Sequence, residues 1–355
     1  MTLEDLRKQI DNLDHRLVDL IAERMTIIRE VGKMKQAAGS PIEDRLREQA
    51  ILEKVKQLAQ QRSLDPSEIE KIYQRLFYIS KEMQGSTVAF QGEFGAYSEE
   101  AASLFFGPAA RLRPCETLED VFQSVEKDEV QYGLVPVENS LEGSIPRTYD
   151  LLLDSRLKVC GETQLRIVHC LIGLPAARLE TVREVYSHPQ ALGQSKTFLR
   201  HMGWRQNPAT DTAGSVKFIK EQGDVTKAAI ASARAAEIYG MNILVRGIED
   251  NDHNYTRFFI LSREDAPSTG NDKTSLVFSV KHSPGALYDA LKALAENKAN
   301  LTRIESRPTR QKAWEYNFYV DIEGHRQDEA VKTALEELRQ ETIFVKVLGS
   351  YPRTS

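Results

Sequence analysis

The spacing of apolar residues separates a helical first segment from a mixed remainder. From Leu3 to Met34 the apolar positions recur in steps of three and four, the period of one face of an α-helix. The pattern predicts one helix over about residues 4–38, roughly 52 Å long at 1.5 Å per residue. A compact globule of this segment's size has a radius of gyration of only about 12 Å. We therefore expect this helix to pack along a partner chain.

Short apolar strands alternate with helices from Thr87 onward, which is typical of α/β structure. The last segment changes to strand, helix, strand, strand, helix, strand, which is the βαββαβ order of a ferredoxin-like α+β unit. A polar stretch without periodicity, at residues 266–272, reads as a linker before it. The sequence thus predicts a multidomain protein, with an all-α domain at 1–85, an α/β domain at 86–265 and an α+β domain at 273–355.

Composition excludes several classes of protein. Lys+Arg 47 against Asp+Glu 52 gives a net charge of -5 and no broad field for nucleic acid. No run of about 18 apolar residues offers a membrane span, and the acidic, amphipathic first residues are unlike a signal peptide. Three cysteines without a Cys-x-x-Cys pair offer neither a disulfide framework nor a metal site. We therefore expect a cytoplasmic protein with no membrane, nucleic-acid or metal partner.

Arg24 interrupts the apolar stripe of the first helix. A cation in such a stripe is costly unless it is paired, so an intrahelical or interchain ion pair is one explanation. Lys35 lies three turns plus about 20° further along, on the same face and about 16 Å away. Two cations on one face indicate a pocket for an anionic small molecule within a helical dimer. Further polar groups extend the set: Arg47, Glu48, Ser80 and Gln84.

Residues 1–84 resemble an all-helical chorismate mutase. The matching positions are Arg7, Arg24, Lys35, Asp44, Arg47, Glu48, Ser80 and Gln84. In that family the arginines bind the two carboxylates of chorismate, and the counterparts of Lys35 and Gln84 hydrogen-bond its ether oxygen. The counterpart of Glu48 orients the ring hydroxyl. The resemblance implies an intertwined dimer in which Arg7, Arg24, Lys35, Glu48 and Gln84 are catalytic and Asp44, Arg47 and Ser80 bind substrate.

That chemistry suits the residues. A pericyclic rearrangement needs no nucleophile or base, only a compact conformer and stabilisation of charge developing on oxygen. The lack of histidine in the set is therefore expected.

In the middle segment, five junctions between a strand end and a helix start carry hydroxyl or amide residues. Such junctions form sites for carboxylates or phosphates, although ordinary N-capping explains any one of them. No full Gly-x-Gly-x-x-Gly or Walker sequence is present, which argues against a nucleotide cofactor and against a prephenate dehydrogenase. The junctions lie at residues 90–98, 137–143, 187–190, 210–212 and 231–232.

Residues 87–262 resemble prephenate dehydratase over their whole length, through motifs at 92–98, 136–143, 187–190 and 254–258. The family has two α/β lobes, like a periplasmic binding protein, with the active site between them. The resemblance implies an essential Thr256, which we expect to hydrogen-bond the departing oxygen, since a hydroxyl is a weak acid near pH 7. Arg257 either binds a carboxylate or forms a structural ion pair. The other implied substrate contacts are Asn139, Ser140, Ser187 and Gln194.

Two histidines of this segment receive structural interpretations. His169 alternates with apolar neighbours and is expected to be a core histidine, whereas His188 precedes a proline and is expected in a turn.

Residues 284–291 and 305–308 match the two signature motifs of an ACT domain attached to prephenate dehydratases. In that family they line an intersubunit pocket for phenylalanine, the feedback inhibitor. A helix start without a bulky side chain leaves amide groups open to a carboxylate, although a tight strand-to-helix turn also fits Gly285. The resemblance implies effector contacts from Gly285, Ala286, Leu287, Glu305, Ser306 and Arg307.

Together these resemblances imply a bifunctional chorismate mutase–prephenate dehydratase that is inhibited by L-phenylalanine, uses no cofactor and forms a homodimer or a larger homo-oligomer. Two alternatives belong to other classes. A catalytically silent amino-acid sensor, built from a bilobed binding module and an ACT domain, has no use for Arg24, Lys35 and Thr256 together. A transcription regulator with a similar effector domain is opposed by the near-balanced charge and the lack of a clear basic recognition helix.

Overall fold

The computed structural model describes residues 2–37, 45–83, 86–107, 110–309 and 315–354. It divides into two compact units, one made of the described residues up to Ser86 with 110–111, the other of all the rest. Among the described residues, no helix combines the length and apolarity that crossing a membrane requires.

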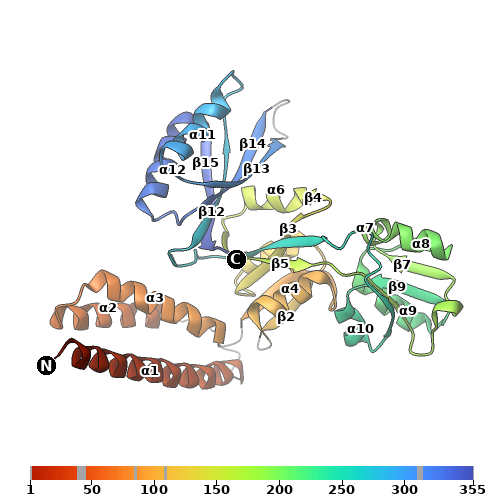
Figure 1. Cartoon of the computed structure of the whole chain (residues 1–355), viewed down its shortest axis with the longest axis horizontal. Coiled ribbons are helices and arrows are strands. Elements are labelled where there is room, and N and C mark those ends of the chain that lie inside the picture. Colours follow the sequence, from red (N-terminus) through yellow and green to blue (C-terminus); the bar gives the residue numbers. More distant parts are fainter. Residues whose placement is uncertain (1, 38–44, 84–85, 108–109, 310–314, 355) are drawn as a thin grey trace. The chain divides into compact units, whose positions relative to one another are not determined.

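The described residues of the first unit form three helices (Figure 1). Asp65 caps the third helix by accepting a hydrogen bond from the Ser67 amide. Met25, Val55, Ala59 and Phe77 form its buried core. The apolar stripe of the first helix stays largely outside that core. The helices are α1 (Leu3–Ala37), α2 (Arg45–Gln61) and α3 (Pro66–Met83).

The second unit begins with a mixed sheet in the strand order β2-β1-β3-β11-β5, with β4 paired to β3. Its central strands are apolar on both faces, as expected for a sheet covered by helices. The elements are β1 (Thr87–Gln91), α4 (Tyr97–Phe106), β2 (Arg111–Cys115), α5 (Leu118–Glu126), β3 (Tyr132–Asn139), β4 (Gly143–Ser144), α6 (Pro146–Asp154), β5 (Lys158–Arg166) and β11 (Tyr255–Ser262).

A second sheet, in the order β10-β6-β9-β7-β8, is inserted between β5 and β11. The chain therefore crosses between the two sheets twice, after β5 and before β11. The elements are β6 (Cys170–Gly173), the 3₁₀ turn η1 (Leu179–Thr181), β7 (Glu184–Ser187), α7 (Pro189–Gln194), α8 (Lys196–Met202), β8 (Arg205–Pro208), α9 (Thr212–Gln222), β9 (Lys227–Ala231), α10 (Ala233–Tyr239) and β10 (Asn242–Arg246).

The third sheet is antiparallel, in the order β13-β14-β12-β15. Helices α11 and α12 pack together over it, and their apolar faces close a separate core (Figure 1). The elements are β12 (Asp272–Ser279), α11 (Ala286–Glu296), β13 (Leu301–Pro308), β14 (Tyr316–Glu323), α12 (Glu329–Glu341) and β15 (Phe344–Pro352).

The third sheet also shares a core with the first, so the expected linker at 266–272 does not separate two independent bodies. Tyr319 and Tyr351 belong to the same buried cluster as the strands of the first sheet. Gly349 on β15 approaches β5 so closely that a Cβ there would lie 2.0 Å from the Val159 carbonyl oxygen. The stretch before β12 is a compact turn, in which the buried Asp272 carboxylate accepts hydrogen bonds from the amides of Thr269 and Gly270.

Candidate active sites

Arg24 and Ser80 meet in the helical unit, although 56 residues separate them. The guanidinium Nη1 of Arg24 donates to Ser80 Oγ over 2.7 Å, and the Ser80 hydroxyl donates in turn to the Leu76 carbonyl one turn earlier. The guanidinium also lies 5.7 Å from the centre of the Phe77 ring. Arg24 is thus held by α3 through one of its five N–H groups, and no other hydrogen bond of its guanidinium occurs among the described residues.

The other expected mutase residues are placed less completely. Arg7 is exposed on the first turns of α1, and Arg47 and Glu48 lie in the first turn of α2. Lys35 lies on α1, but its side chain is outside the described residues, as are Asp44 and Gln84. The structure therefore brings together Arg24 and Ser80 and leaves the rest of this site a prediction.

Asn139 and Thr256 lie opposite one another on the antiparallel strands β3 and β11. The Asn139 carboxamide oxygen accepts hydrogen bonds from the backbone amides of Leu141 and Glu142, at 3.0 and 3.1 Å. This fixes the orientation of the amide, so its Nδ2 must face the other way. Nδ2 donates to Thr256 Oγ1 over 3.0 Å and to Asn254 Oδ1 over 2.8 Å.

The Thr256 hydroxyl is therefore an acceptor within the protein. No acceptor for its own proton occurs among the hydrogen bonds of the residues that the structure describes, so the proton is available to a ligand. The side chain is 9% exposed, and Asn139 is 6% exposed. The Asn139–Thr256 pair is largely shielded from water, so a hydrogen bond that Thr256 donates to a ligand is stronger than it would be in water.

The network continues from this pair into the second sheet. Asn254 Nδ2 donates to Gln194 Oε1 over 2.9 Å, and His169 Nε2 lies 2.9 Å from the same oxygen. The other ring nitrogen of His169 lies 2.7 Å from the Tyr97 hydroxyl. His169 is buried, as expected for a core histidine, but both of its ring nitrogens have polar partners. Burial lowers the pKa of His169, opposed in part by the hydrogen bond to Gln194.

Sequence reasoning missed this extension. Asn254 and Tyr97 lie inside the motifs that mark the family resemblance, and that was the only signal for them. Nothing in the period-2 pattern around His169 distinguishes it from an ordinary buried residue.

The two expected serine contacts use their hydroxyl protons within the protein. Ser140 Oγ donates to the His253 carbonyl over 2.8 Å and accepts from the Tyr255 amide. Ser187 is fully buried and donates to the Ile230 carbonyl over 2.6 Å. Both hydroxyls therefore donate to backbone carbonyls.

Arg257 forms a structural ion pair, which is one of the two roles that the sequence allows for it. Its guanidinium lies 2.6 Å from Glu162 on β5 and 2.7 Å from Asp321 on β14, and Nη2 donates to the Tyr351 hydroxyl over 3.2 Å. Burial by itself would lower the pKa of Arg257, but Asp321, Tyr351 and Glu162 outweigh it and raise the pKa above the ordinary value. The Arg257 guanidinium thus joins β5 of the first sheet to the third sheet.

The expected effector residues of β13 also point toward the first sheet. Glu305 accepts a hydrogen bond from Ser144 on β4, and Arg307 lies 3.1 Å from Asp150 on α6. Arg303, two residues earlier, lies 2.9 Å from Glu138. Ser306 lies between them in sequence and is exposed on the opposite side of this edge strand.

The other expected effector residues lie at the start of α11. Gly285 is exposed with a left-handed φ of 87°, and an added Cβ would have only Asp289 within 4 Å. Ala286 and Leu287 follow it as the first helical residues, both half-buried.

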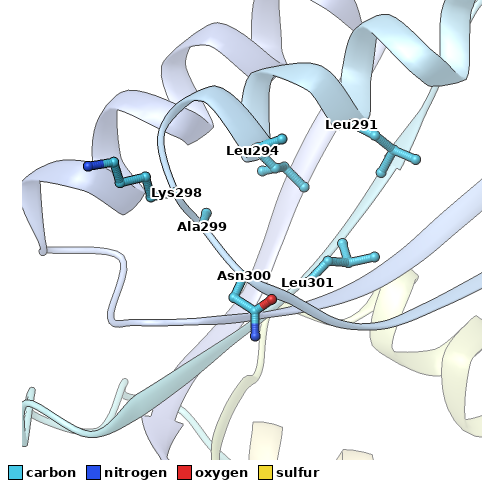
Figure 2. Close-up of a pocket in the computed structure, with 7 residues that line it drawn as sticks. Leu291, Leu294, Lys298, Ala299, Asn300 and Leu301 are labelled. Atoms are coloured by element: carbon cyan, nitrogen blue, oxygen red, sulfur yellow. The ribbon is translucent and has the colours of Figure 1, made fainter.

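A pocket opens at the other, C-terminal end of α11 (Figure 2). None of the six expected effector residues lines it. Its lining is mainly apolar, with Lys298 and Asn300 at the turn into β13. Within the described part of the chain, no cluster of His, Cys, Asp and Glu side chains is arranged to hold a metal ion. The lining residues are Leu291, Leu294, Ala295, Lys298, Ala299, Asn300 and Leu301.

Three families match the chain in succession: Chorismate mutase type II at residues 6–85, Prephenate dehydratase at 88–266 and ACT domain at 274–340. Among solved structures, a prephenate dehydratase from Arthrobacter aurescens in complex with L-Phe is 31% identical, with a TM-score of 0.69, and the match covers 75% of this chain and 90% of that one. A structure described as a quorum quenching acylase, GqqA, is 36% identical with a TM-score of 0.70 and covers 76% of this chain and 98% of that one.

Two curated relatives match this chain over nearly their whole length. The bifunctional chorismate mutase/prephenate dehydratase of Aquifex aeolicus (strain VF5) is 39% identical over 361 residues, covering 99% of this chain and 98% of that protein. That of Stutzerimonas stutzeri is 36% identical over 359 residues, with the same coverage. The chain therefore belongs to the family of bifunctional chorismate mutase/prephenate dehydratases.

Proposed function

We propose that the chain rearranges chorismate to prephenate in its helical unit and converts prephenate to phenylpyruvate in its second unit, with L-phenylalanine as feedback inhibitor. Family membership supports both reactions and their regulation through the ACT domain. The observation that carries the residue assignment is the Thr256 hydroxyl, which accepts a hydrogen bond from Asn139 and keeps its own proton for a ligand.

In the dehydratase step, the ring hydroxyl of prephenate leaves as hydroxide while carbon dioxide is lost and the ring becomes aromatic, and solvent then protonates the hydroxide to water. Thr256 donates a hydrogen bond to the departing oxygen, because its hydroxyl is too weak an acid to transfer a proton outright near pH 7. Asn139 donates to Thr256 at the same time, and hydrogen bonds in series strengthen one another. Gln194 offers its amide nitrogen, which lies 3.4 Å from Glu142, to a carboxylate of the substrate. Ser140 and Ser187 stabilise the backbone on either side.

In the mutase step, Arg24 presents its remaining N–H groups to a carboxylate of chorismate, with Ser80 holding the guanidinium in place. Lys35 and Gln84 stabilise the charge that develops on the ether oxygen, Glu48 orients the ring hydroxyl, and Asp44 and Arg47 complete the contacts to substrate. Catalysis then rests on conformational restriction and electrostatic stabilisation alone.

A second copy of the chain completes the mutase site. The apolar stripe of α1 is exposed, with Leu13 at 57% and Leu20 at 61%, as for a helix that lacks its partner. Arg7 and Lys35 are 28 residues apart on α1, about 42 Å by rise per residue, so both reach one substrate only if they belong to different chains. These features support an intertwined dimer.

Regulation acts through the side chains of β3 and β11 that lie on the opposite face from Asn139 and Thr256. Successive side chains of a strand point to opposite faces, so Glu138 and Arg257 point away from Asn139 and Thr256. Both are held by the third sheet, Glu138 by Arg303 and Arg257 by Asp321. Phenylalanine bound near Gly285, Ala286, Leu287 and Ser306 would move these strands and so alter the Asn139–Thr256 pair. Glu305 and Arg307 would transmit the movement through their contacts with Ser144 and Asp150.

The βαββαβ order of residues 273–355 supports a ferredoxin-like ACT domain, and the two preceding sheets support a two-lobed binding-protein architecture.

One experiment tests this function. The full chain is supplied with chorismate, and prephenate and phenylpyruvate are followed separately, with and without L-phenylalanine. We expect both products and a fall in phenylpyruvate when phenylalanine is added. Binding of phenylalanine without either product would identify the silent sensor instead.

A further inference from the structure

The hydrogen bonds around Gln194 run in one direction, which two backbone amides determine. Leu141 and Glu142 donate to the oxygen of Asn139, so Asn139 donates to the oxygen of Asn254. Asn254 therefore has only its nitrogen left for Gln194, whose oxygen it binds at 2.9 Å. The side-chain amide of Asn139 thereby orients that of Asn254, which in turn orients that of Gln194.

This direction also fixes the proton on His169. The Gln194 oxygen already accepts from Asn254, so the His169 Nε2 atom 2.9 Å away must carry a hydrogen. In the other neutral tautomer, two lone pairs would face each other over that distance. A neutral ring then has Nδ1 unprotonated. The Tyr97 hydroxyl lies 2.7 Å from Nδ1 and 3.0 Å from the Val168 carbonyl oxygen, so its one proton is shared between these two acceptors.

We propose that His169 is a positioning residue of the dehydratase, which acts with Tyr97 to hold the Gln194 amide with its oxygen toward Asn254 and its nitrogen toward the substrate. His169 is 2% exposed and reaches the substrate only through Gln194. The inference rests on the proposed function, in that Gln194 and Thr256 serve prephenate. It explains why this buried histidine is paired at both ring nitrogens.

The position of the pair in the fold supports this role. Tyr97 lies on α4 against the first sheet, and Gln194 lies on α7 against the second. His169 sits directly before β6, where the chain crosses from one sheet to the other, and its backbone amide donates to Glu249 on the returning crossover over 2.8 Å. Because His169 is hydrogen-bonded to α4, to α7 and to the returning crossover, it holds Gln194 in place beside Asn254.

Variants of the full chain test the proposal. His169→Leu removes the donor and leaves the Gln194 amide free to rotate, so we expect kcat on supplied prephenate to fall about 10- to 100-fold, the usual range for an unpaired buried polar group. His169→Gln places an N–H donor near the position of Nε2 and should recover most of that loss. Tyr97→Phe removes the hydrogen-bond partner of His169 Nδ1, and its kcat should lie between those of His169→Leu and His169→Gln. Chorismate turnover should not change.

A double-mutant cycle with Gln194 separates positioning from general structural support. If His169 acts through Gln194, His169→Leu should cause no further loss of kcat in a Gln194→Ala background. The proposal would be overturned if the losses of kcat from His169→Leu and Gln194→Ala multiplied in the double variant. A normal kcat in His169→Leu would overturn it as well. Should His169→Leu fail to fold, the comparison of His169→Gln and Tyr97→Phe, each with and without Gln194→Ala, decides the matter.

Thr256→Ala keeps failure of this inference distinct from failure of the proposed function. Activity of Thr256→Ala on prephenate would reject the site itself. An inactive Thr256→Ala beside a fully active His169→Leu would reject only the role of His169.

Discussion

The side-chain amide of Asn139 donates a hydrogen bond to the hydroxyl of Thr256 over 3.0 Å, although the two residues are 117 positions apart. Two backbone amides donate to the Asn139 oxygen, so the Asn139 nitrogen must be the donor in the bond to Thr256. Thr256 is thereby left with a proton to give and no competing acceptor among the described residues. This relationship underlies the first prediction.

Thr256→Ala should abolish phenylpyruvate formation from supplied prephenate, because it removes the only group proposed to hydrogen-bond the departing oxygen. Thr256→Ser keeps the hydroxyl and should retain appreciable activity. Both are measured in the full chain, with prephenate formation from chorismate as the internal control. Substantial dehydratase activity in Thr256→Ala would count decisively against the assignment.

Lys35→Ala should lower mutase activity by a factor of roughly 10²–10³, as for the loss of a preorganised donor to a developing oxyanion. Turnover of supplied prephenate should stay near normal. Lys33→Ala is a matched control, since two residues along a helix correspond to a rotation of about 200°. Equal chorismate turnover in the two variants would remove Lys35 from the site.

Mutase sites shared between chains make a quantitative prediction. Arg7→Ala and Lys35→Ala homodimers should each be nearly inactive. After unfolding and refolding of an equal mixture, half of the dimers are mixed, and each has one doubly damaged site and one intact site. About a quarter of wild-type mutase activity should return in a two-fold symmetric dimer. No recovery despite demonstrated subunit exchange would show that each site belongs to one chain.

Arg303→Gln should weaken inhibition of the dehydratase by L-phenylalanine, because it breaks the link between the third sheet and Glu138. Allosteric coupling is typically worth about 5- to 150-fold, so we expect half-inhibition to need at least about fivefold more phenylalanine. Arg353→Gln, which removes a more exposed ion pair with Glu323, is the control. An unchanged inhibition curve for Arg303→Gln would exclude this route.

Removal of residues 273–355 is a harsher test of regulation. The mutase should keep working, and phenylalanine inhibition should disappear. The structure adds that dehydratase activity should fall as well, because Tyr319 and Tyr351 complete the core of the first sheet and Asp321 pairs with Arg257. Inhibition of the truncated chain as strong as in the full chain would place the effector site elsewhere.

Stability should depend on pH through His169. Burial lowers its pKa in the folded protein, so below about pH 6.5, the ordinary histidine value, the unfolded chain takes up a proton that the folded protein does not. This contribution to the free energy of unfolding is complete above that pH and is lost as the pH falls. His169→Gln should therefore flatten the fall of the unfolding temperature between about pH 6.5 and 5. His201→Gln, at an exposed position of α8, controls for the loss of an imidazole.

Periodicity and motifs were sufficient for the local structure. The periodicity predicts the first helix at about 4–38, and the helix spans Leu3–Ala37. Such features depend on neighbours within a few positions, whose spacing and caps are visible in the sequence. The same holds for the strand and helix order of the last segment.

The partners of individual polar residues needed the folded chain. Arg257 chooses Glu162 and Asp321 over a substrate carboxylate because strands β5 and β14 bring both carboxylates to its face of β11. His169 looks like any buried residue until Gln194 and Tyr97 converge on its ring. These contacts join positions 25 to 95 residues apart. A one-residue change of register in β11 would turn Arg257 to the other face of its sheet. Pairing of that kind depends on three-dimensional packing and leaves no periodic trace in the sequence.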